Sequence, residues 1–362
     1  METRMISRSA RLMLAAAAAI VVMGCGGGQS TTEGGAGSPA GAGQKVQING
    51  AGTTFPYPIY SKWFDEYHKL HPSVEINYQS IGSGGGIRQI TNETVFFGAT
   101  DGPMTDEQLK AAPGPILHFP AVLGANVPVY NVPGVDAELK FNGPVLADIF
   151  LGKIASWNDA ALAKLNPGVK LPNTHITVVH RAEGSGTTYI WADYLSKVSP
   201  EWKSKVGVAT AINWPTGVGG KGNEGVTGLV SQTPGSIGYV ELIYALQNKI
   251  SFGSVQNAEG EFVRASEQSV TAAAAGAAAN MPADFRVSIT NAPGAGAYPI
   301  SSFTWILLYE SPKDLVQSKI MVDFMKWALS EGQKFAPELG YAPLPAAVVE
   351  MDLKALERVK TS

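Results

Sequence analysis

Three runs of glycine and small hydroxyl residues constrain this 362-residue sequence most, because each lies between an apolar β-like run and a helix-like segment. They occupy residues 50–55, 82–86 and 181–188. A helix start offers unpaired backbone N–H groups and the positive end of the helix dipole, and glycines let the chain approach an anion closely. One such run is usually an ordinary helix N-cap. Three of them, one carrying Arg181, favour a shared oxyanion site.

Strand-like and helix-like segments alternate through most of residues 45–310, which is typical of α/β layers around a largely parallel sheet. Thr105 and Gln108 form a capping-box pattern that predicts a short helix after Pro103. The 318 residues that follow residue 44 suit about two domains. Among other elements, we expect strands at 45–48, 74–79, 116–119, 127–131 and 303–309, and helices at 56–71, 86–94, 187–197 and 312–330.

The beginning of the chain has the composition of an export signal. Three arginines precede an apolar run that is too short to span a bilayer as a helix, which needs about 20 residues. Cys25, the only cysteine, follows this run and resembles the lipidated cysteine of bacterial lipoproteins. We therefore expect a lipoprotein signal peptide at 1–24, lipidation at Cys25 and a flexible Gly/Ser-rich tether at 25–44. A plain secretory signal with a chance cysteine is the alternative.

The charge of the chain excludes one class of partner. The formal net charge is −3, and removal of the predicted signal, with its three Arg and one Glu, leaves −5. No basic run or basic-aromatic pattern appears in the sequence, which argues against a nucleic-acid partner. Since the overall field does not attract an anion, local dipoles and arginine must do so.

Two charged positions near the glycine runs are candidates for an oxyanion site. Arg181 offers a planar set of donors, and Glu183 could fix its orientation, although a surface ion pair of little energetic weight is the alternative. Asp101 follows a strand-like run, at the strand end where open α/β sheets place their ligands. A turn aspartate is the commoner reading of such a residue. Beside an anion, however, a carboxylate accepts a hydrogen bond only from an oxyanion that carries a proton.

Other motifs do not indicate enzymatic or cofactor chemistry. Residues 220–225 match the G-x-G-x-x-G pattern, but Trp214 and Pro215 precede them where a dinucleotide site needs a strand. The pair His68 and His71 has no obvious third metal ligand. Ser185 lacks the G-x-S-x-G elbow of hydrolases. We expect no catalytic residues, no metal and no cofactor.

The chain contains further motifs around and between the three glycine runs, and the whole set is residues 50–56, 81–86, 97–101, 151–154 with Trp157, 181–187, 219–223 and 235–240. Taken together, these motifs closely resemble the periplasmic phosphate-binding proteins of bacterial ABC phosphate importers, over residues 48–349. The resemblance implies a two-lobe periplasmic binding protein (type II) α/β fold, in which each lobe is a mixed sheet flanked by helices and the ligand lies in the interlobe cleft. It further implies lobe 1 at 45–120 plus 300–362 and lobe 2 at 121–299.

The resemblance also implies which residues bind phosphate. Asp101 would accept the phosphate proton. Glu183, where the family often has Asp, would hold Arg181 in position without contacting phosphate itself. Gly84 replaces a serine of some relatives, which removes one peripheral donor. The expected phosphate ligands are Thr54, Phe55, Ser83, Asp101, Arg181, Ser185, Gly186 and Thr187.

The function implied is high-affinity binding of inorganic phosphate outside the cytoplasmic membrane and its delivery to an ABC importer. The expected partners are phosphate and the permease subunits, with a lipid anchor as the only membrane contact, and we expect a monomer on the periplasmic or cell-surface side of the envelope. Asp101 disfavours sulfate, which has no proton to donate, but not arsenate. A phosphate-ester hydrolase and a receptor for another tetrahedral oxyanion remain alternatives.

Overall fold

A nine-stranded mixed sheet runs through the part of the chain that the structure, a computed structural model, describes, namely residues 45–278 and 280–362. Its main path has the strand order β2-β1-β3-β12-β4-β8-β6-β7, and β9 pairs with β4 beside this path. The described residues form one compact unit. The predicted signal peptide, Cys25 and the tether, at 1–44, lie outside the described residues.

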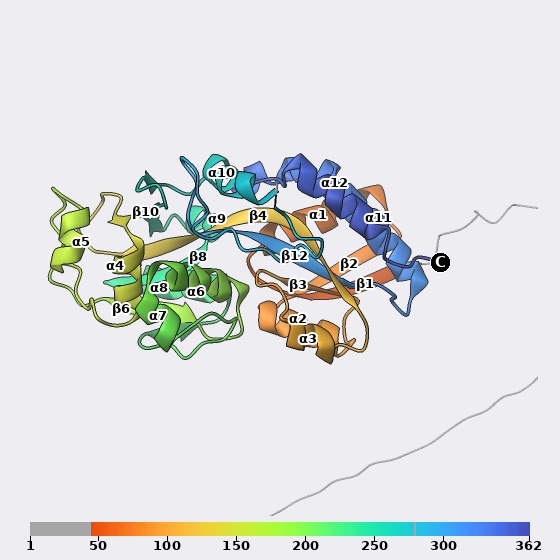
Figure 1. Cartoon of the computed structure of the whole chain (residues 1–362), viewed down its shortest axis with the longest axis horizontal. Helices are drawn as coiled ribbons and strands as arrows, with labels where there is room; N and C mark the ends of the chain where they lie inside the picture. The colour runs from red at the N-terminus through yellow and green to blue at the C-terminus, as the bar shows by residue number, and fades with distance from the viewer. Residues whose placement is uncertain (1–44, 279) are drawn as a thin grey trace, which may run out of the picture. The chain divides into compact units, whose positions relative to one another are not determined.

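The first half of the sheet contains β1, β2, β3 and β12. Strand β1 (Val46–Gly52) pairs in parallel with β2 (Val74–Ser80) and β3 (Phe97–Thr100), whereas β12 (Ser301–Tyr309) pairs antiparallel with β3. Figure 1 shows α2 and α3 on one side of these strands and α11 and α12 on the other. The bounds are α1 Tyr57–Leu70, α2 Ser83–Thr91, α3 Asp106–Ala111, α11 Leu315–Leu329 and α12 Ala346–Leu356, with 3₁₀ turns at Glu331–Phe335 and Pro337–Leu339.

Glycine allows α2 to lie directly against the first half. A Cβ at Gly86 would lie 2.5 Å from the Cα of Gly52 and 2.7 Å from the carbonyl oxygen of Ala99. A side chain at this position would therefore push α2 away from β1 and β3. The second glycine run thus fixes where the N-terminus of α2 lies.

Strand β4 (Ile116–Asn131) passes from the first half into the second half of the sheet. It pairs antiparallel with β12 up to Ala125 and with β8 from Asn126 onward. The two separate strands predicted at 116–119 and 127–131 are therefore wrong, because they are parts of one strand. Proline cannot donate to a ladder, but the register shifts opposite Thr304 and Trp305, so that a bulge next to Pro120 absorbs the irregularity.

The second half of the sheet contains β8, β6 and β7. Strand β6 (Thr177–Arg181) pairs in parallel with β8 (Ser236–Glu241) and β7 (Val218–Gly220), and β9 (Ser251–Phe252) pairs antiparallel with β4. A separate small sheet has the order β11-β10-β5. The remaining bounds are α4 Gly143–Phe150, α5 Ala160–Leu165, α6 Gly186–Val198, α7 Pro200–Lys205, α8 Gly222–Gln232, α9 Leu242–Gln247, α10 Glu267–Ala278, β5 Lys140–Phe141, β10 Ser254–Gln256 and β11 Phe262–Val263.

Several local predictions can be compared with these bounds. The capping box is confirmed, because the Thr105 hydroxyl oxygen accepts from the backbone N–H of Gln108 and the Gln108 side-chain oxygen accepts from the backbone N–H of Thr105. The predicted helix at 86–94 instead begins at Ser83 and ends at Thr91. The statement that no strand precedes residues 220–225 is wrong, because β7 ends at Gly220 and α8 begins at Gly222.

One continuous apolar core extends through both halves, and no described helix has the length and apolar character required to cross a membrane. The pairing partner of β4 changes between Ala125 and Asn126, five residues beyond the lobe boundary predicted at 120/121. The residue ranges of the two lobes stay a prediction.

Candidate functional site

The three glycine runs lie next to one another, at the point where the two halves of the sheet meet. They follow β1, β2 and β6, and each leads into a helix: α1, α2 or α6. The backbone N–H of Gly84 donates to the carbonyl of Gly184 at 3.0 Å, which joins the second run to the third. A Cβ at Gly186 would overlap Ser83 Oγ and Asp101 Oδ2. Only a residue without a side chain permits this approach.

Asp101 directly follows β3, a strand of the first half of the sheet, and is fully buried. Its Oδ1 accepts from the Thr304 hydroxyl at 2.7 Å, and its Oδ2 accepts from the Thr53 hydroxyl. Burial raises the pKa of Asp101 to about 7, although these hydroxyls and the charge of Arg181 act in the opposite direction. Asp101 is therefore poised to hold or release a proton near neutral pH.

Arg181 faces this carboxylate from the last position of β6, with 1% of its side chain exposed. Its Nε donates to Glu183 Oε1 at 2.9 Å, its Nη2 donates to the same oxygen, and its Nη1 donates to Thr187 Oγ1 at 3.1 Å. Two of its five N–H groups remain for another acceptor. Because the pair is almost wholly buried on the arginine side, it is not the weak surface ion pair considered as an alternative.

Glu183 connects Arg181 to the start of α8. The oxygen that receives Arg181 also accepts the backbone N–H of Gly222 at 3.1 Å. One carboxylate oxygen thus fixes both the guanidinium plane and the first turn of α8.

Four buried hydroxyls surround Asp101 and Arg181, and each accepts a hydrogen bond from a protein N–H. Ser83 Oγ accepts from the backbone of Asp101 at 3.1 Å, and Ser185 Oγ accepts from the backbone of Thr188 at 3.1 Å. The other two are Thr187 Oγ1, which accepts from Arg181, and Thr54 Oγ1, which accepts from Asn223 Nδ2 at 2.7 Å.

The direction of these hydrogen bonds decides whether the hydroxyls can donate to a ligand. A hydroxyl that accepts an N–H keeps its own proton for another acceptor. The four protons can therefore all be donated to an anion, while Thr53 and Thr304 direct theirs to Asp101. The cluster therefore places several hydroxyl donors and one guanidinium opposite a single carboxylate, that of Asp101.

Of the predicted site residues, Phe55 differs most from expectation. Its backbone N–H is hydrogen-bonded to Thr53 Oγ1 at 3.2 Å, and its buried ring lies against Gly124. The structure brings the other predicted residues together, namely Thr54, Ser83, Asp101, Arg181, Glu183, Ser185, Gly186 and Thr187.

Three buried residues of this cluster were not singled out from the sequence: Thr53, Thr304 and Asn223. Thr53 adjoins the predicted Thr54 within the first glycine run, so its hydroxyl was available as a signal. Thr304 lies 203 residues from Asp101 in the sequence, and only the antiparallel pairing of β3 with β12 brings it near. Asn223 belongs to the glycine-rich segment at 219–223, which contributes to the family resemblance but gives no role for this residue by itself.

No group of three His, Cys, Asp or Glu side chains in residues 45–278 and 280–362 is arranged to hold a metal ion. Around Ser185, within the same residues, the only side-chain hydrogen bond recorded is the helix cap to Thr188, so the described structure provides no base to activate its hydroxyl. The cluster does present the donors that a bound oxyanion requires.

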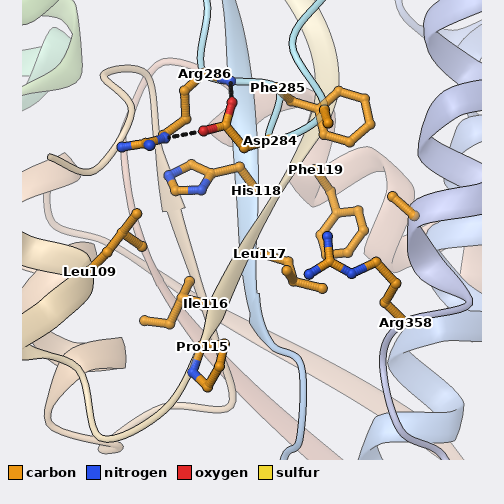
Figure 2. Close-up of a pocket in the computed structure, with 12 residues that line it drawn as sticks. Leu109, Pro115, Ile116, Leu117, His118, Phe119, Asp284, Phe285, Arg286 and Arg358 are labelled. Carbon is orange, nitrogen blue, oxygen red and sulfur yellow. Dashed lines mark hydrogen bonds and ion pairs between the residues drawn. The ribbon is translucent and has the colours of Figure 1, made fainter. Parts of the chain in front are cut away.

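A cavity of about 210 Å³ lies elsewhere, between the beginning of β4, residues 283–286 and α12 (Figure 2). Arg286 and Arg358 both line it, and each has a carboxylate partner. Burial lowers the pKa of His118 to about 4, so that this side chain is neutral. None of the lining residues carries a hydroxyl, which makes this cavity a poorer anion site than the cluster around Arg181.

Comparisons with known proteins agree with this geometry. The chain matches the family model of the PBP superfamily domain over residues 35–332. It is 51% identical over 309 residues to the phosphate-binding protein PstS of Xylella fastidiosa strain Temecula1, covering 85% of this chain and 84% of that protein. For the protein of the same name from Pasteurella multocida, the identity is 50% over 308 residues, covering 85% and 89%. The crystal structure of a phosphate-binding protein from Stenotrophomonas maltophilia has a TM-score of 0.65 at 19% identity, covers 85% of this chain and 93% of that one, and supports the fold.

Proposed function

The chain belongs to the PstS-type phosphate-binding proteins of the PBP superfamily, and on that premise we propose that it captures inorganic phosphate outside the cytoplasmic membrane and delivers it to an ABC importer. The protein acts as a receptor and not as an enzyme. The observation that carries this proposal is the opposition of one buried carboxylate, Asp101, to the donors of Arg181 and the four hydroxyls.

This arrangement suits phosphate better than a fully deprotonated oxyanion. Phosphate at neutral pH keeps at least one proton, which it can donate to Asp101, while its other oxygens accept from Arg181 and the hydroxyls. Sulfate has no such proton and would face the ionised carboxylate. A site that depends on one buried polar bond discriminates against a ligand that lacks the matching proton.

The proposed phosphate ligands are those expected from the sequence: Thr54, Phe55, Ser83, Asp101, Arg181, Ser185, Gly186 and Thr187, with Glu183 behind Arg181. The hydrogen bonds that orient Ser83, Thr54, Ser185 and Thr187 support the assignment of their hydroxyls as donors. Phe55 would contribute its backbone N–H only if the bond to Thr53 rearranges when phosphate binds.

The proposal also covers the two lobes, the docking to the importer and the membrane anchor. Lobe 1 at 45–120 plus 300–362 and lobe 2 at 121–299 close on phosphate, and both present surfaces to the permease subunits of the importer. The protein is a monomer on the outer face of the membrane, held there by a lipid on Cys25 through the tether at 25–44. The position of Cys25 after an apolar run supports this anchoring.

Equilibrium dialysis with radiolabelled phosphate tests the function. We expect one phosphate per chain with micromolar or tighter affinity, which corresponds to about 8 kcal/mol or more. Excess arsenate should displace the label, and excess sulfate at pH 8 should not. Release of phosphate from p-nitrophenyl phosphate, measured on the same sample, would instead favour the hydrolase; equal displacement by sulfate would favour a general oxyanion receptor.

A further inference from the structure

Asn223 occupies the first turn of α8 and is completely buried where three segments meet. Its Oδ1 accepts from the backbone N–H of Glu241 at 3.0 Å. Its Nδ2 donates to Thr54 Oγ1 at 2.7 Å and to Thr187 Oγ1 at 3.4 Å. Since a carbonyl oxygen must face the Glu241 N–H, the orientation of the amide is fixed and its two N–H groups must face the threonines.

The amide therefore determines the direction in which two hydroxyls donate. Thr54 accepts from Asn223 Nδ2 and from the backbone N–H of Asn223 at 3.4 Å, and Thr187 accepts from Arg181 Nη1 as well as from Asn223 Nδ2. A hydroxyl that accepts these bonds must direct its own proton to a different acceptor. Without the amide, each hydroxyl keeps one N–H donor, namely the backbone of residue 223 for Thr54 and Arg181 for Thr187. Its second lone pair is then free to turn toward the anion.

The same amide also connects the two halves of the protein. Thr54 follows β1 in the first half, whereas Asn223 and Thr187 follow β7 and β6 in the second half. Nearby, the Tyr244 hydroxyl donates to the carbonyl of Thr54 at 2.6 Å, which adds a second connection across the same junction. Both bonds exist only while the two halves are in contact.

We propose that Asn223 is a positioning residue of the phosphate site: it holds the Thr54 and Thr187 hydroxyls as donors and links the two halves when phosphate is bound. The proposal rests on the proposed function of the same site. Its main consequence is kinetic. A bond that forms on closure stabilises the bound state, so its loss should accelerate phosphate release far more than it slows capture.

Two substitutions separate this role from simple structural support. Asn223→Ala removes the donors, and we expect phosphate to bind about 10- to 100-fold more weakly, mainly through faster dissociation. Asn223→Asp keeps the shape but replaces the donors by acceptors, so that both hydroxyls donate to residue 223 and a negative charge faces the anion. We expect its affinity to fall further than that of Asn223→Ala.

Asn166 provides a matched control. It is also buried, and its side chain donates to the carbonyls of Lys140 and Leu162 and accepts from the N–H of Lys140, away from the cluster. Asn166→Ala should lower the midpoint of thermal unfolding without changing phosphate affinity or release. If Asn223 served stability alone, its variants would behave in the same way.

The experiment combines calorimetric titration of the full chain with phosphate and a chase of bound radiolabelled phosphate by excess unlabelled phosphate. A Thr54→Val background completes a double-mutant cycle: Asn223→Ala should cost clearly less there than in the wild type. Wild-type affinity and release in both Asn223 variants, or an undiminished cost in the Thr54→Val background, would overturn the inference while leaving the proposed function intact. Failure of the wild type to bind phosphate would overturn both. Asn223→Asp retains the side-chain volume, so it gives a readout even if Asn223→Ala does not fold.

Discussion

Sulfate exclusion should depend on pH, because the residue proposed to reject sulfate has a pKa of about 7. An ionised Asp101 repels sulfate, but a protonated Asp101 can donate a hydrogen bond to it. The protonated fraction rises from about one tenth at pH 8 to nearly all at pH 5, given that pKa. If only the protein with protonated Asp101 binds sulfate, the apparent sulfate affinity is proportional to the protonated fraction. It should therefore rise about tenfold from pH 8 to pH 5.

Calorimetric titration with sulfate at pH 5, 6, 7 and 8, at constant ionic strength, measures this dependence. Asp101→Asn is the control, because it presents a neutral amide at every pH. It should bind sulfate more tightly than the wild type at pH 8 and show little change with pH. A wild-type sulfate affinity that does not rise as the pH falls, or a slope that persists in Asp101→Asn, would refute the assignment of Asp101 as the group that senses the ligand proton.

Three further predictions concern the same cluster. Gly186→Ala should weaken phosphate binding about 10- to 100-fold in calorimetry, because the added methyl overlaps Asp101 and Ser83, whereas Gly228→Ala, with open space around it, should bind as the wild type does. Arg181→Ala should lower phosphate affinity at least about 100-fold, and near-normal affinity would move the site elsewhere. In the absence of phosphate, the raised pKa of Asp101 makes the folded state bind a proton more tightly than the unfolded state, so its contribution to stability is largest below pH 4 and is lost as the pH rises through about 7. From pH 5 to pH 8, the free energy of unfolding, measured in urea, should therefore fall in the wild type relative to Asp101→Asn by up to about 3 kcal/mol, and parallel pH profiles would contradict the shift.

Local residue patterns were sufficient to predict much of the fold and of the cluster. The capping box at Thr105 and the starts of α1 and α6 depend on neighbouring residues and were predicted to within one residue, whereas α2 begins three residues earlier than predicted. Pairing between distant strands does not depend on neighbouring residues. The continuity of β4 depends on two partners and a bulge, and the contact of Thr304 with Asp101 depends on β12 lying beside β3.

Asn223 shows a different limit of sequence reasoning. The glycine-rich segment around it contributes to the family resemblance and also matches a dinucleotide pattern, and the short strand β7 and the helix α8 form a strand-turn-helix unit there. Neither pattern indicates where the amide at the start of α8 lies. That position follows from the meeting of two halves of the chain, which no local pattern records.

A crystal structure of the protein with phosphate tests the central claim most directly. We predict a single tetrahedral density between the N-terminus of α6 and the end of β3, with one oxygen within hydrogen-bond distance of Asp101 and another within reach of the Arg181 guanidinium. Density in the cavity beside Arg286 and Arg358, or none at the junction of the two halves, would contradict the account.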